Sequence, residues 1–385
     1  MDQMTLELTQ ALVSRRSITP DDAGCQTLIA DRLKAIGFAI HHLPVGDVSN
    51  VLAIHGQSGP TLLFVGHTDV VPPGVESDWQ SPPFTPSIRD GRLYGRGTAD
   101  MKGSIAAFIT ACERIAPNQA SLPFRIAILL TSDEEGPARD GIAQIAPQLT
   151  SYLSSVDYCL VGEPSSRNQL GDTIRVGRRG SLTATVTVAG KGGHVAYPEQ
   201  VDNPAHRLSQ FLGELADTTW DTGTDAFPPT SFQVTHLETD THTSNMVPGS
   251  AIAQFNLRYS PALTHTDIIQ RIETIAHRHI GDDQLSLIWH LSAKPFSSEP
   301  GALRTAITQA IQATCGIEVE ANTAGGTSDG RFIAPLGAEV VELGPVNASI
   351  HQIDESIDIA ELDQLSELYE ATLHRLARLV RAPNQ

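Results

Sequence analysis

Thiol groups are scarce in this sequence of 385 residues, which contains four cysteines, Cys25, Cys112, Cys159 and Cys315, and no CxxC pair. Cysteines so far apart argue against both a disulfide framework and a zinc site built from thiolates, and they favour reduced thiols in the cytoplasm. The first 17 residues lack the basic start and the continuous apolar core of a signal peptide. No stretch approaches the roughly 18 consecutive apolar residues of a membrane-spanning helix. We therefore expect a soluble cytoplasmic protein with no membrane partner.

Positive charge is also in deficit, because 26 Lys and Arg residues stand against 44 Asp and Glu residues, for a formal net charge of -18. A protein held on nucleic acid by counterion release needs the opposite balance, so no nucleic-acid partner is expected. An anionic substrate stays compatible with this composition, since a few arginines can reverse the field inside a cleft.

Internal repeats and low-complexity tracts are absent, and the length exceeds what one hydrophobic core ordinarily serves, so two domains are expected. From residue 5 to about residue 180, apolar strand-like runs alternate with helical patterns, which predicts a layered α/β domain. The strand-like runs are 51–56, 61–67, 124–132 and 157–163, and the helical patterns are 22–37 and 101–115. The stretch 71–97, with several Pro and Gly residues, is predicted to be a long loop.

The segment from about 180 to 293 follows a different order. Its strand-like runs are 181–190, 230–238, 251–260 and 284–292, and its helical patterns are 204–216 and 266–279. The resulting βαββαβ order is that of a ferredoxin-like domain. A helical pattern at 303–313 and a strand-like run at 338–344 then resume the first arrangement. We therefore predict a discontinuous α/β domain, residues 1–179 and 294–385, with a compact domain inserted at 180–293.

Acidic and histidine residues recur where the predicted strands end. His67 and Asp69 lie two positions apart, hence on one side of an extended backbone. In an open α/β sheet the carboxyl ends of the strands converge on the ligand crevice, so separate segments can bring such side chains together. The candidates at these ends and in the late segment 347–356 are His67, Asp69, Asp100, Asp133, Glu134, Glu135, Glu163 and His351.

Two histidines with three carboxylates suit zinc, which accepts imidazole nitrogen and carboxylate oxygen. If one acid bridges, five residues give each of two metals three protein ligands. Two metals about 3.5–4 Å apart would clamp a carbonyl oxygen and lower the pKa of a shared water toward roughly 7. One of the adjacent Glu134 and Glu135 would bind metal, and the other would take the proton from that water. Asp69 would orient the second ring nitrogen of His67.

Each of these residues also has an ordinary structural interpretation. His67 could be a packed core histidine, and Asp100 stands where the N-cap of a helix belongs. Glu163 could simply solvate the end of a strand, and the run 133–135 could be an exposed loop. The shared position at strand ends favours a joint site, but periodicity does not identify the metal.

Five segments closely resemble those of the dinuclear zinc aminoacylase/carboxypeptidase family: GHTDVVPPG, GRGTADMKG, TSDEEGPARDG, VGEPSS and SIHQIDES. The resemblance runs over essentially the whole chain. Within the family, the segments 18–26, 177–183, 193–207, 325–333 and 344–355 look like those of members that remove succinate from N-succinyl-LL-2,6-diaminopimelate. The implied products are succinate and LL-2,6-diaminopimelate, in lysine biosynthesis via diaminopimelate.

The resemblance further implies a layered, zinc-peptidase-like catalytic domain with an inserted ferredoxin-like domain that serves as a lid and for dimerisation. It implies a homodimer and two Zn²⁺ per subunit, which Co²⁺ can replace. Carried over residue by residue, Asp100 bridges the two metals. The remaining ligands are His67 and Glu163 for one metal, and Glu135 and His351 for the other.

For catalysis the resemblance implies Glu134 as the general base, Asp69 behind His67, and His194 as an oxyanion donor from the inserted domain of the other protomer. A histidine flanked by glycines, as His194 is, is also typical of an ordinary exposed loop. Arginine side chains suit a substrate with several carboxylates. The implied substrate-binding residues are Arg178, Arg179, Ser181, Tyr197, Asn245, Arg258, Thr327 and Asn347.

Three other functions fit parts of the sequence. Residues 326–330 fit the G-x-S-x-G nucleophile elbow with His351 downstream, but a serine hydrolase leaves the acids at 100, 135 and 163 unexplained. N-acetylornithine deacetylase and related aminoacylases share similar metal motifs, so the substrate could differ while the metals stay. A non-catalytic binding or dimerisation module on the same fold is the third, and the presence of both Glu134 and the full ligand set argues against it.

Overall fold

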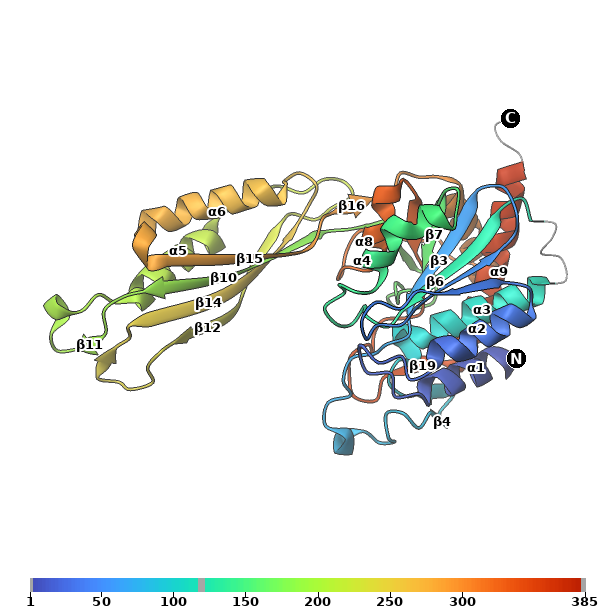
Figure 1. The fold of residues 1–385 in the computed structure, drawn as a ribbon, viewed down its shortest axis with the longest axis horizontal. Helices are drawn as coiled ribbons and strands as arrows, with labels where there is room; N and C mark the ends of the chain where they lie inside the picture. The colour runs from blue at the N-terminus through green and yellow to red at the C-terminus, as the bar shows by residue number, and fades with distance from the viewer. Residues whose placement is uncertain (1–2, 117–121, 382–385) are drawn as a thin grey trace. The chain divides into compact units, whose positions relative to one another are not determined.

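The computed structural model describes residues 3–116 and 122–381, which form two units (Figure 1). Unit 1 comprises residues 1–177, 297–322 and 328–385, and unit 2 comprises residues 178–296 and 323–327. The chain therefore passes from one unit to the other at 177/178 and 296/297, whereas the sequence predicts boundaries at 179/180 and 293/294. The short return of 323–327 to unit 2 has no counterpart in the prediction.

Unit 1 is built on a mixed eight-stranded sheet. Its strands in spatial order are β1 (Ala39–His42), β2 (Asn50–His55), β6 (Arg125–Thr131), β3 (Thr61–His67), β7 (Tyr158–Val161), β18 (Glu339–Glu342), β8 (Thr173–Arg175) and β17 (Glu320–Asn322). The central strand β3 runs parallel to both of its neighbours, β6 and β7, while β1 and β2 are antiparallel additions at one side. All seven residues of β3 are buried, as expected of a strand covered on both faces.

Helices cover both faces of this sheet. The longer ones are α1 (Gln3–Val13), α2 (Cys25–Ala35), α3 (Gly103–Ile115), α7 (Ala302–Cys315) and α9 (Ile359–Arg381). Figure 1 shows α1, α2 and α3 together on one side of the strands, with the short helices α4 (Ile142–Ile145) and α8 (Gly330–Ile333) on the other side. Helix α9 lies outside the elements predicted above, although its buried leucines recur at helical spacing.

An aromatic cluster joins the central strand to two of these helices. Phe64 of β3 stacks on Phe108 of α3, with ring centroids 4.1 Å apart and ring planes 13° from parallel. Tyr369 of α9 meets both rings edge-on, and its hydroxyl donates a hydrogen bond of 2.6 Å to the carbonyl oxygen of Leu343. All three rings are fully buried, so the cluster anchors β3, the strand that ends in His67.

A smaller sheet organises the loop region of unit 1. It consists of β19 (Ser356–Asp358), β5 (Arg92–Tyr94) and β4 (Ser87–Arg89), paired antiparallel. Two of these strands lie inside residues 71–97, where the sequence predicts only a loop. Strands of three residues are too short to show an alternating pattern, which explains why they are missed.

Unit 2 has the predicted βαββαβ order. Its long elements along the chain are β10 (Gly180–Ala189), α5 (Pro204–Asp217), β12 (Ser231–Thr239), β14 (Ser250–Tyr259), α6 (His265–His279) and β15 (Leu285–Ala293). The antiparallel sheet has the order β12-β14-β10-β15. Alternate residues of β10, such as Leu182 and Val186, are buried against α5 and α6, whereas Thr183 and Thr185 face the other side. Helix α6 begins with a capping box between Thr264 and Asp267.

The four cysteines all lie in the described part of the chain and are free thiols. Across residues 3–116 and 122–381, none of the helices combines the length and the apolar character needed to cross a bilayer.

Replacing Phe64 by Ala should destabilise unit 1 by about 3–5 kcal/mol, because the change deletes a fully buried ring at the meeting point of β3, α3 and α9. Equilibrium chemical unfolding, followed by circular dichroism, measures this loss. Ile88→Ala, at an exposed position of β4, is the control and should change the free energy of unfolding by less than about 0.5 kcal/mol. Equal effects of the two changes would contradict the anchoring role of the cluster.

Candidate metal centre

The predicted acids and histidines gather at the carboxyl ends of the three adjacent parallel strands β6, β3 and β7. His67 is the last residue of β3, and it lies opposite Thr131, the last residue of β6. Glu134 follows β6, and Glu163 follows β7. Parallel neighbours end at the same edge, so three loops deliver their acids to one place.

The side chain of Asp100 lies between two histidines. Its Oδ1 is 3.2 Å from Nε2 of His67, and its Oδ2 is 3.3 Å from Nε2 of His351. His67 Nε2 is also 3.7 Å from Oε1 of Glu163, and His351 Nε2 is 2.9 Å from Oε1 of Glu135. The five residues predicted as metal ligands thus lie together. Asp100 stands between two pairs, His67 with Glu163 on one side and His351 with Glu135 on the other.

These separations fit metal binding. Two ligand atoms that each lie 2.0–2.1 Å from a tetrahedral zinc ion are roughly 3.3 Å apart, close to the distances from Asp100 to the two histidines. Ligand atoms of His67, Asp100 and Glu135 lie within 4.8 Å of one another, and so do those of His67, Glu134 and Glu163. Nitrogen and carboxylate oxygen are donors that zinc accepts. The residues present therefore fit two divalent cations, one on each side of Asp100.

The pKa shifts within the cluster also favour the binding of cations. Burial, together with neighbouring carboxylates, raises the pKa of Glu134 and of Glu163 well above the ordinary value. Hydrogen bonds from His351 and His67 outweigh burial and lower the pKa of Asp100, and hydrogen bonds to Asp100 and Glu135 raise the pKa of His351 to about 10. A cluster of buried acids that repel one another is stabilised by positive charge, which cations supply.

Asp69 contacts its neighbours differently from the prediction. The Nδ1 atom of His67 lies 2.9 Å from the backbone carbonyl oxygen of Asp69, whereas the nearest carboxylate oxygen is 3.7 Å away. The carboxylate instead accepts the backbone N–H groups of Glu134 at 3.4 Å and Glu135 at 3.1 Å. One residue therefore orients the imidazole through its main chain and the two glutamates through its side chain.

Asp133, the first acid of the run 133–135, serves the loop rather than the cluster. Its side chain accepts backbone N–H groups of Ala138 at 3.2 Å, Arg139 at 2.8 Å and Asp140 at 3.0 Å. The acid therefore closes the turn that follows Glu134 and Glu135. The order of residues along the chain does not distinguish this role from that of a ligand.

Most of the predicted substrate-binding residues lie in unit 2. Ser181 stands opposite Arg258 in the β10–β14 register, and Asn256 links them by donating to the Ser181 hydroxyl at 3.1 Å and accepting from the Arg258 guanidinium at 3.1 Å. Arg178 is buried and donates to the carbonyl oxygen of Ala324 at 2.8 Å.

The remaining residues of the prediction are dispersed. His194 lies in the short strand β11 (Gly193–His194) with its ring next to that of Tyr197, and both side chains are exposed. The carbonyl oxygen of Asn245 accepts the N–H of Val195, in the same region of unit 2. Thr327 and Arg179 also belong to unit 2, whereas Asn347 belongs to unit 1.

Sequence reasoning misses Arg331 and Asp329, which lie beside the cluster in unit 1. Arg331 lowers and Asp329 raises the pKa of Glu134 through space, so both charges act on this carboxyl. The Nε and Nη1 atoms of Arg331 are buried and have no hydrogen-bond partner within the described residues. Both residues lie in the segment 325–333, one of the segments that resemble those of the family. The arginine of this segment could therefore have indicated a site residue.

The arrangement of Ser328 argues against a serine hydrolase. Its hydroxyl is fully buried and donates to Oε1 of Glu342. His351, the proposed partner of such a serine, directs Nε2 toward Asp100 and Glu135. In the part of the chain that the structure describes, Ser328 therefore has no histidine to activate it.

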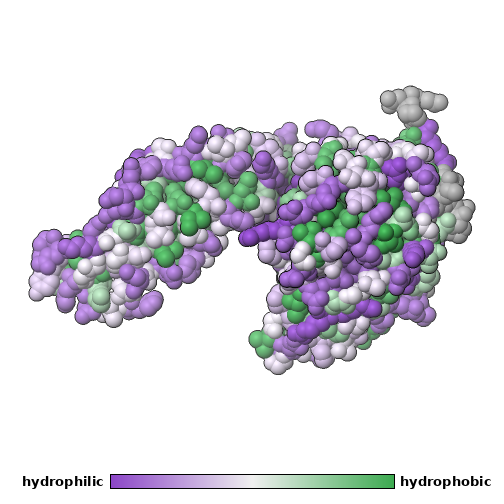
Figure 2. All heavy atoms as spheres, viewed as in Figure 1, coloured by the Kyte–Doolittle hydropathy of each residue, from purple (hydrophilic) through white to green (hydrophobic). Residues whose placement is uncertain are grey.

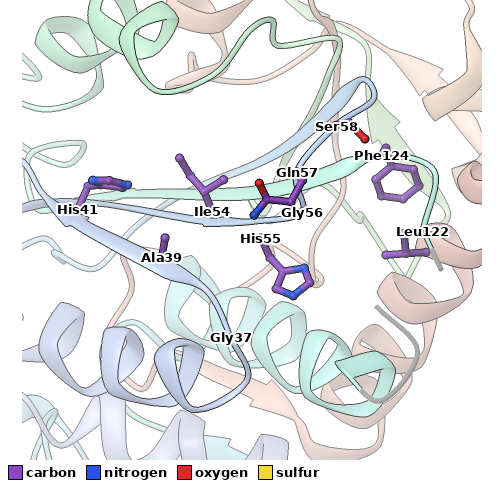
Figure 3. A pocket seen from close by; sticks show the side chains of 10 residues that line it. All are labelled: Gly37, Ala39, His41, Ile54, His55, Gly56, Gln57, Ser58, Leu122 and Phe124. Carbon is purple, nitrogen blue, oxygen red and sulfur yellow. The ribbon is translucent and has the colours of Figure 1, made fainter. Parts of the chain in front are cut away.

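A surface pocket elsewhere in unit 1 is a separate feature (Figure 3). It is lined by Gly37, Ala39, His41, Ile54, His55, Gly56, Gln57, Ser58, Leu122 and Phe124. These residues belong mainly to β1, β2 and the segments next to them, and none is a predicted site residue. The candidate site is the acid and histidine cluster, not this pocket.

Curated relatives match the chain over nearly its whole length. The succinyl-diaminopimelate desuccinylase of Alkalilimnicola ehrlichii is 50% identical over 372 residues, which cover 97% of this chain and 99% of the relative. The protein of the same name from Marinobacter nauticus is 51% identical over 372 residues, covering 97% and 98%. That from Xanthomonas campestris pv. campestris (strain B100) is 48% identical over 376 residues, covering 98% and 100%.

Solved structures share the fold. An M20 family metallo-carboxypeptidase from Sulfolobus solfataricus superposes with a TM-score of 0.82 at 19% identity, covering 98% of this chain and 100% of that one. A dinuclear metal binding peptidase of the M20 family from Bacillus subtilis gives a TM-score of 0.73 at 14% identity, covering 97% of each chain. At these identities the likeness concerns the fold, and the predicted fold class is confirmed.

The family model described as Peptidase family M20/M25/M40 matches residues 63–375, a range that includes every strand end of the cluster. Together with the full-length relatives, this match confirms the family that the sequence motifs predict. The chain belongs to peptidase family M20/M25/M40.

Proposed function

We propose that the protein is a metal-dependent amide hydrolase that converts N-succinyl-LL-2,6-diaminopimelate and water to succinate and LL-2,6-diaminopimelate, in lysine biosynthesis via diaminopimelate. The observation that carries the proposal is the carboxylate of Asp100 between His67 and His351, with Glu134 beside it. The substrate follows from the relatives named succinyl-diaminopimelate desuccinylase, which are about half identical over almost the whole chain.

The metals are proposed to be two zinc ions per subunit, with cobalt as a possible replacement. His67, Asp100 and Glu163 would hold one, and Asp100, Glu135 and His351 the other. When bound, such ions polarise an amide carbonyl and lower the pKa of a water molecule.

Glu134 is the proposed general base. Its carboxylate lies within 4.8 Å of ligand atoms of His67 and Glu163, and its backbone N–H is held by the carboxylate of Asp69. It accepts the proton of the attacking water and then donates that proton to the departing amine nitrogen, so that the amide C–N bond breaks. A fixed backbone keeps the carboxylate in place for both transfers.

Recognition of the substrate carboxylates is assigned to arginines and their hydrogen-bonding neighbours. The proposed contacts are those of the prediction: Arg178, Arg179, Ser181, Tyr197, Asn245, Arg258, Thr327 and Asn347. The adjacent Ser181, Asn256 and Arg258 in unit 2 support this assignment, because they form one polar group on the sheet. In unit 1, the buried and unpartnered nitrogens of Arg331 add a donor suited to a carboxylate.

Unit 2 is the proposed dimerisation unit, with His194 as an oxyanion donor supplied to the other subunit. Of the helices in the described residues, α5 and α6 cover one face of its sheet, and apolar side chains remain exposed on the strands. These are Val234 and Leu237 of the edge strand β12, and Ile288 and Leu291 of β15. Figure 2 shows green, apolar surface on this unit between purple rims. Exposed apolar side chains on the two outer strands of a sheet are typical of an interface. The proposed location is the cytoplasm, which the four free thiols support.

Glu134→Gln should lower kcat by about 10²- to 10⁴-fold, because the amide cannot accept the proton of the attacking water. Release of succinate from N-succinyl-LL-diaminopimelate measures the rate, with N-acetylornithine as a competing substrate in a parallel assay. Glu76→Gln, at a half-exposed glutamate of the same unit, is the control and should retain wild-type activity. An active Glu134→Gln enzyme would remove the proposed base, and a preference for N-acetylornithine would overturn the substrate.

Removal of metal by a strong chelator should abolish the activity, and addition of zinc or cobalt should restore it, since the cluster has no other source of Lewis acidity. A serine-directed reagent should leave the enzyme active because the hydroxyl of Ser328 is buried against Glu342. Full activity in the presence of chelator, with inhibition by the serine reagent, would reverse this assignment.

A further inference from the structure

Glu355 is a buried acid that none of the roles described so far uses. It follows His351 by four positions, and its side chain is fully buried. Its Oε1 accepts the backbone N–H groups of Ala99 at 3.0 Å and Asp100 at 3.1 Å, and its Oε2 accepts the N–H of Gly97 at 3.1 Å. Three backbone hydrogen bonds therefore join one carboxylate to the loop that carries Asp100.

Arg96 balances the charge of this carboxylate. Its Nη1 atom donates to Oε2 of Glu355 at 2.7 Å and to the carbonyl oxygen of Gln352 at 3.2 Å, and the residue is 2% exposed. A buried carboxylate is costly unless it is paired and its oxygens are hydrogen-bonded, and here both conditions hold. With the arginine and the three backbone amides as donors, each oxygen of Glu355 accepts two hydrogen bonds.

The backbone brings the two segments together. Strand β19 pairs with β5 in the register Ser356↔Tyr94, and the N–H of Gly95 donates to the carbonyl oxygen of Glu355 at 2.9 Å. The loop of Asp100 thus leaves β5 just where the chain that carries His351 enters β19. His351 itself adopts a left-handed backbone, with φ of 61°, in the turn that precedes Glu355.

We propose that Glu355 is a positioning residue of the metal centre, which holds the backbone of residues 97–100 so that the two oxygens of Asp100 face His67 and His351. The proposal rests on the two-metal site proposed above and is independent of the identity of the substrate. Its physical basis is that the side chain of Glu355 accepts four hydrogen bonds, two of which come from the backbone N–H groups of Asp100 and its neighbour Ala99.

Glu355→Gln tests this role because it keeps the size of the side chain and replaces one acceptor oxygen by an NH₂ donor. In either orientation the NH₂ group of the glutamine faces two buried donors, Arg96 with Gly97 or Ala99 with Asp100, and leaves both without an acceptor. The first orientation frees the start of the loop, and the second frees the backbone of Asp100 itself. Calorimetric titration of the metal-stripped protein with zinc should show binding weakened about 10- to 100-fold, as for other partners that orient ligands. The visible absorption of the cobalt-loaded variant should shift, and kcat should fall with KM little changed.

Two control variants separate positioning from general destabilisation. Asp354→Asn changes the preceding acid, whose Oδ1 accepts the N–H of Gln80 at 3.0 Å instead of the loop of Asp100, and should bind zinc like the wild type. Arg96→Lys weakens the buried ion pair while the carboxylate of Glu355 keeps its three backbone donors. It should lower the stability of the protein more than its zinc affinity.

The proposal would be contradicted if Glu355→Gln bound zinc with wild-type affinity and gave an unchanged cobalt spectrum, whatever its stability. If that variant does not fold, Glu355→Asp takes its place, because it keeps the charge and cannot reach all four donors. Wild-type affinity in Glu355→Asp would equally overturn the role. A wild-type protein that binds no zinc would overturn the proposed function itself, whereas normal wild-type binding with an unaffected variant overturns only the role of Glu355.

Discussion

The carboxylate of Asp100 stands between two imidazoles, and the surrounding structure serves to keep it there. One oxygen faces His67 and the other faces His351, while Glu135 and Glu163 complete the two sides. Ionised carboxylates this close together repel one another in a buried site. The cluster therefore requires nearby positive charge to be stable in its ionised form. That requirement links the fold to metal-dependent chemistry, because the strand ends assemble carboxylates that are stabilised by a cation between them.

Three other acids near the cluster each fix a loop through backbone hydrogen bonds. Asp69 accepts the N–H groups of Glu134 and Glu135, Asp133 accepts three N–H groups of the turn that follows, and Glu355 accepts three from the loop of Asp100. A buried carboxylate can satisfy several backbone donors at once, so it can hold an irregular segment without secondary structure. The net charge of -18 thus includes acids with two different tasks, ligation and support of the backbone.

Much of the fold was predictable because the long strands and helices bury regular faces. The central strands β3 and β6 and the six long elements of unit 2 all appear where the periodicity of apolar residues places them. The short strands β4, β5 and β19 were not predictable, since three residues do not establish a period. Arg331 was missed for a different reason: an arginine in a polar loop has no pattern of its own, and only its position near Glu134 distinguishes it.

By itself the sequence determined which chemical groups are available and that they follow strand ends, because apolar runs mark the strands and the acids directly follow them. It also determined the family, through motifs that extend over nearly the whole chain. Only the tertiary structure decided which atom of each acid meets which partner. Asp69 contacts the imidazole of His67 through its carbonyl oxygen, and Glu355 reaches a loop more than 250 residues earlier in the chain. Such hydrogen bonds depend on the crossing of distant segments, which residue spacing does not encode.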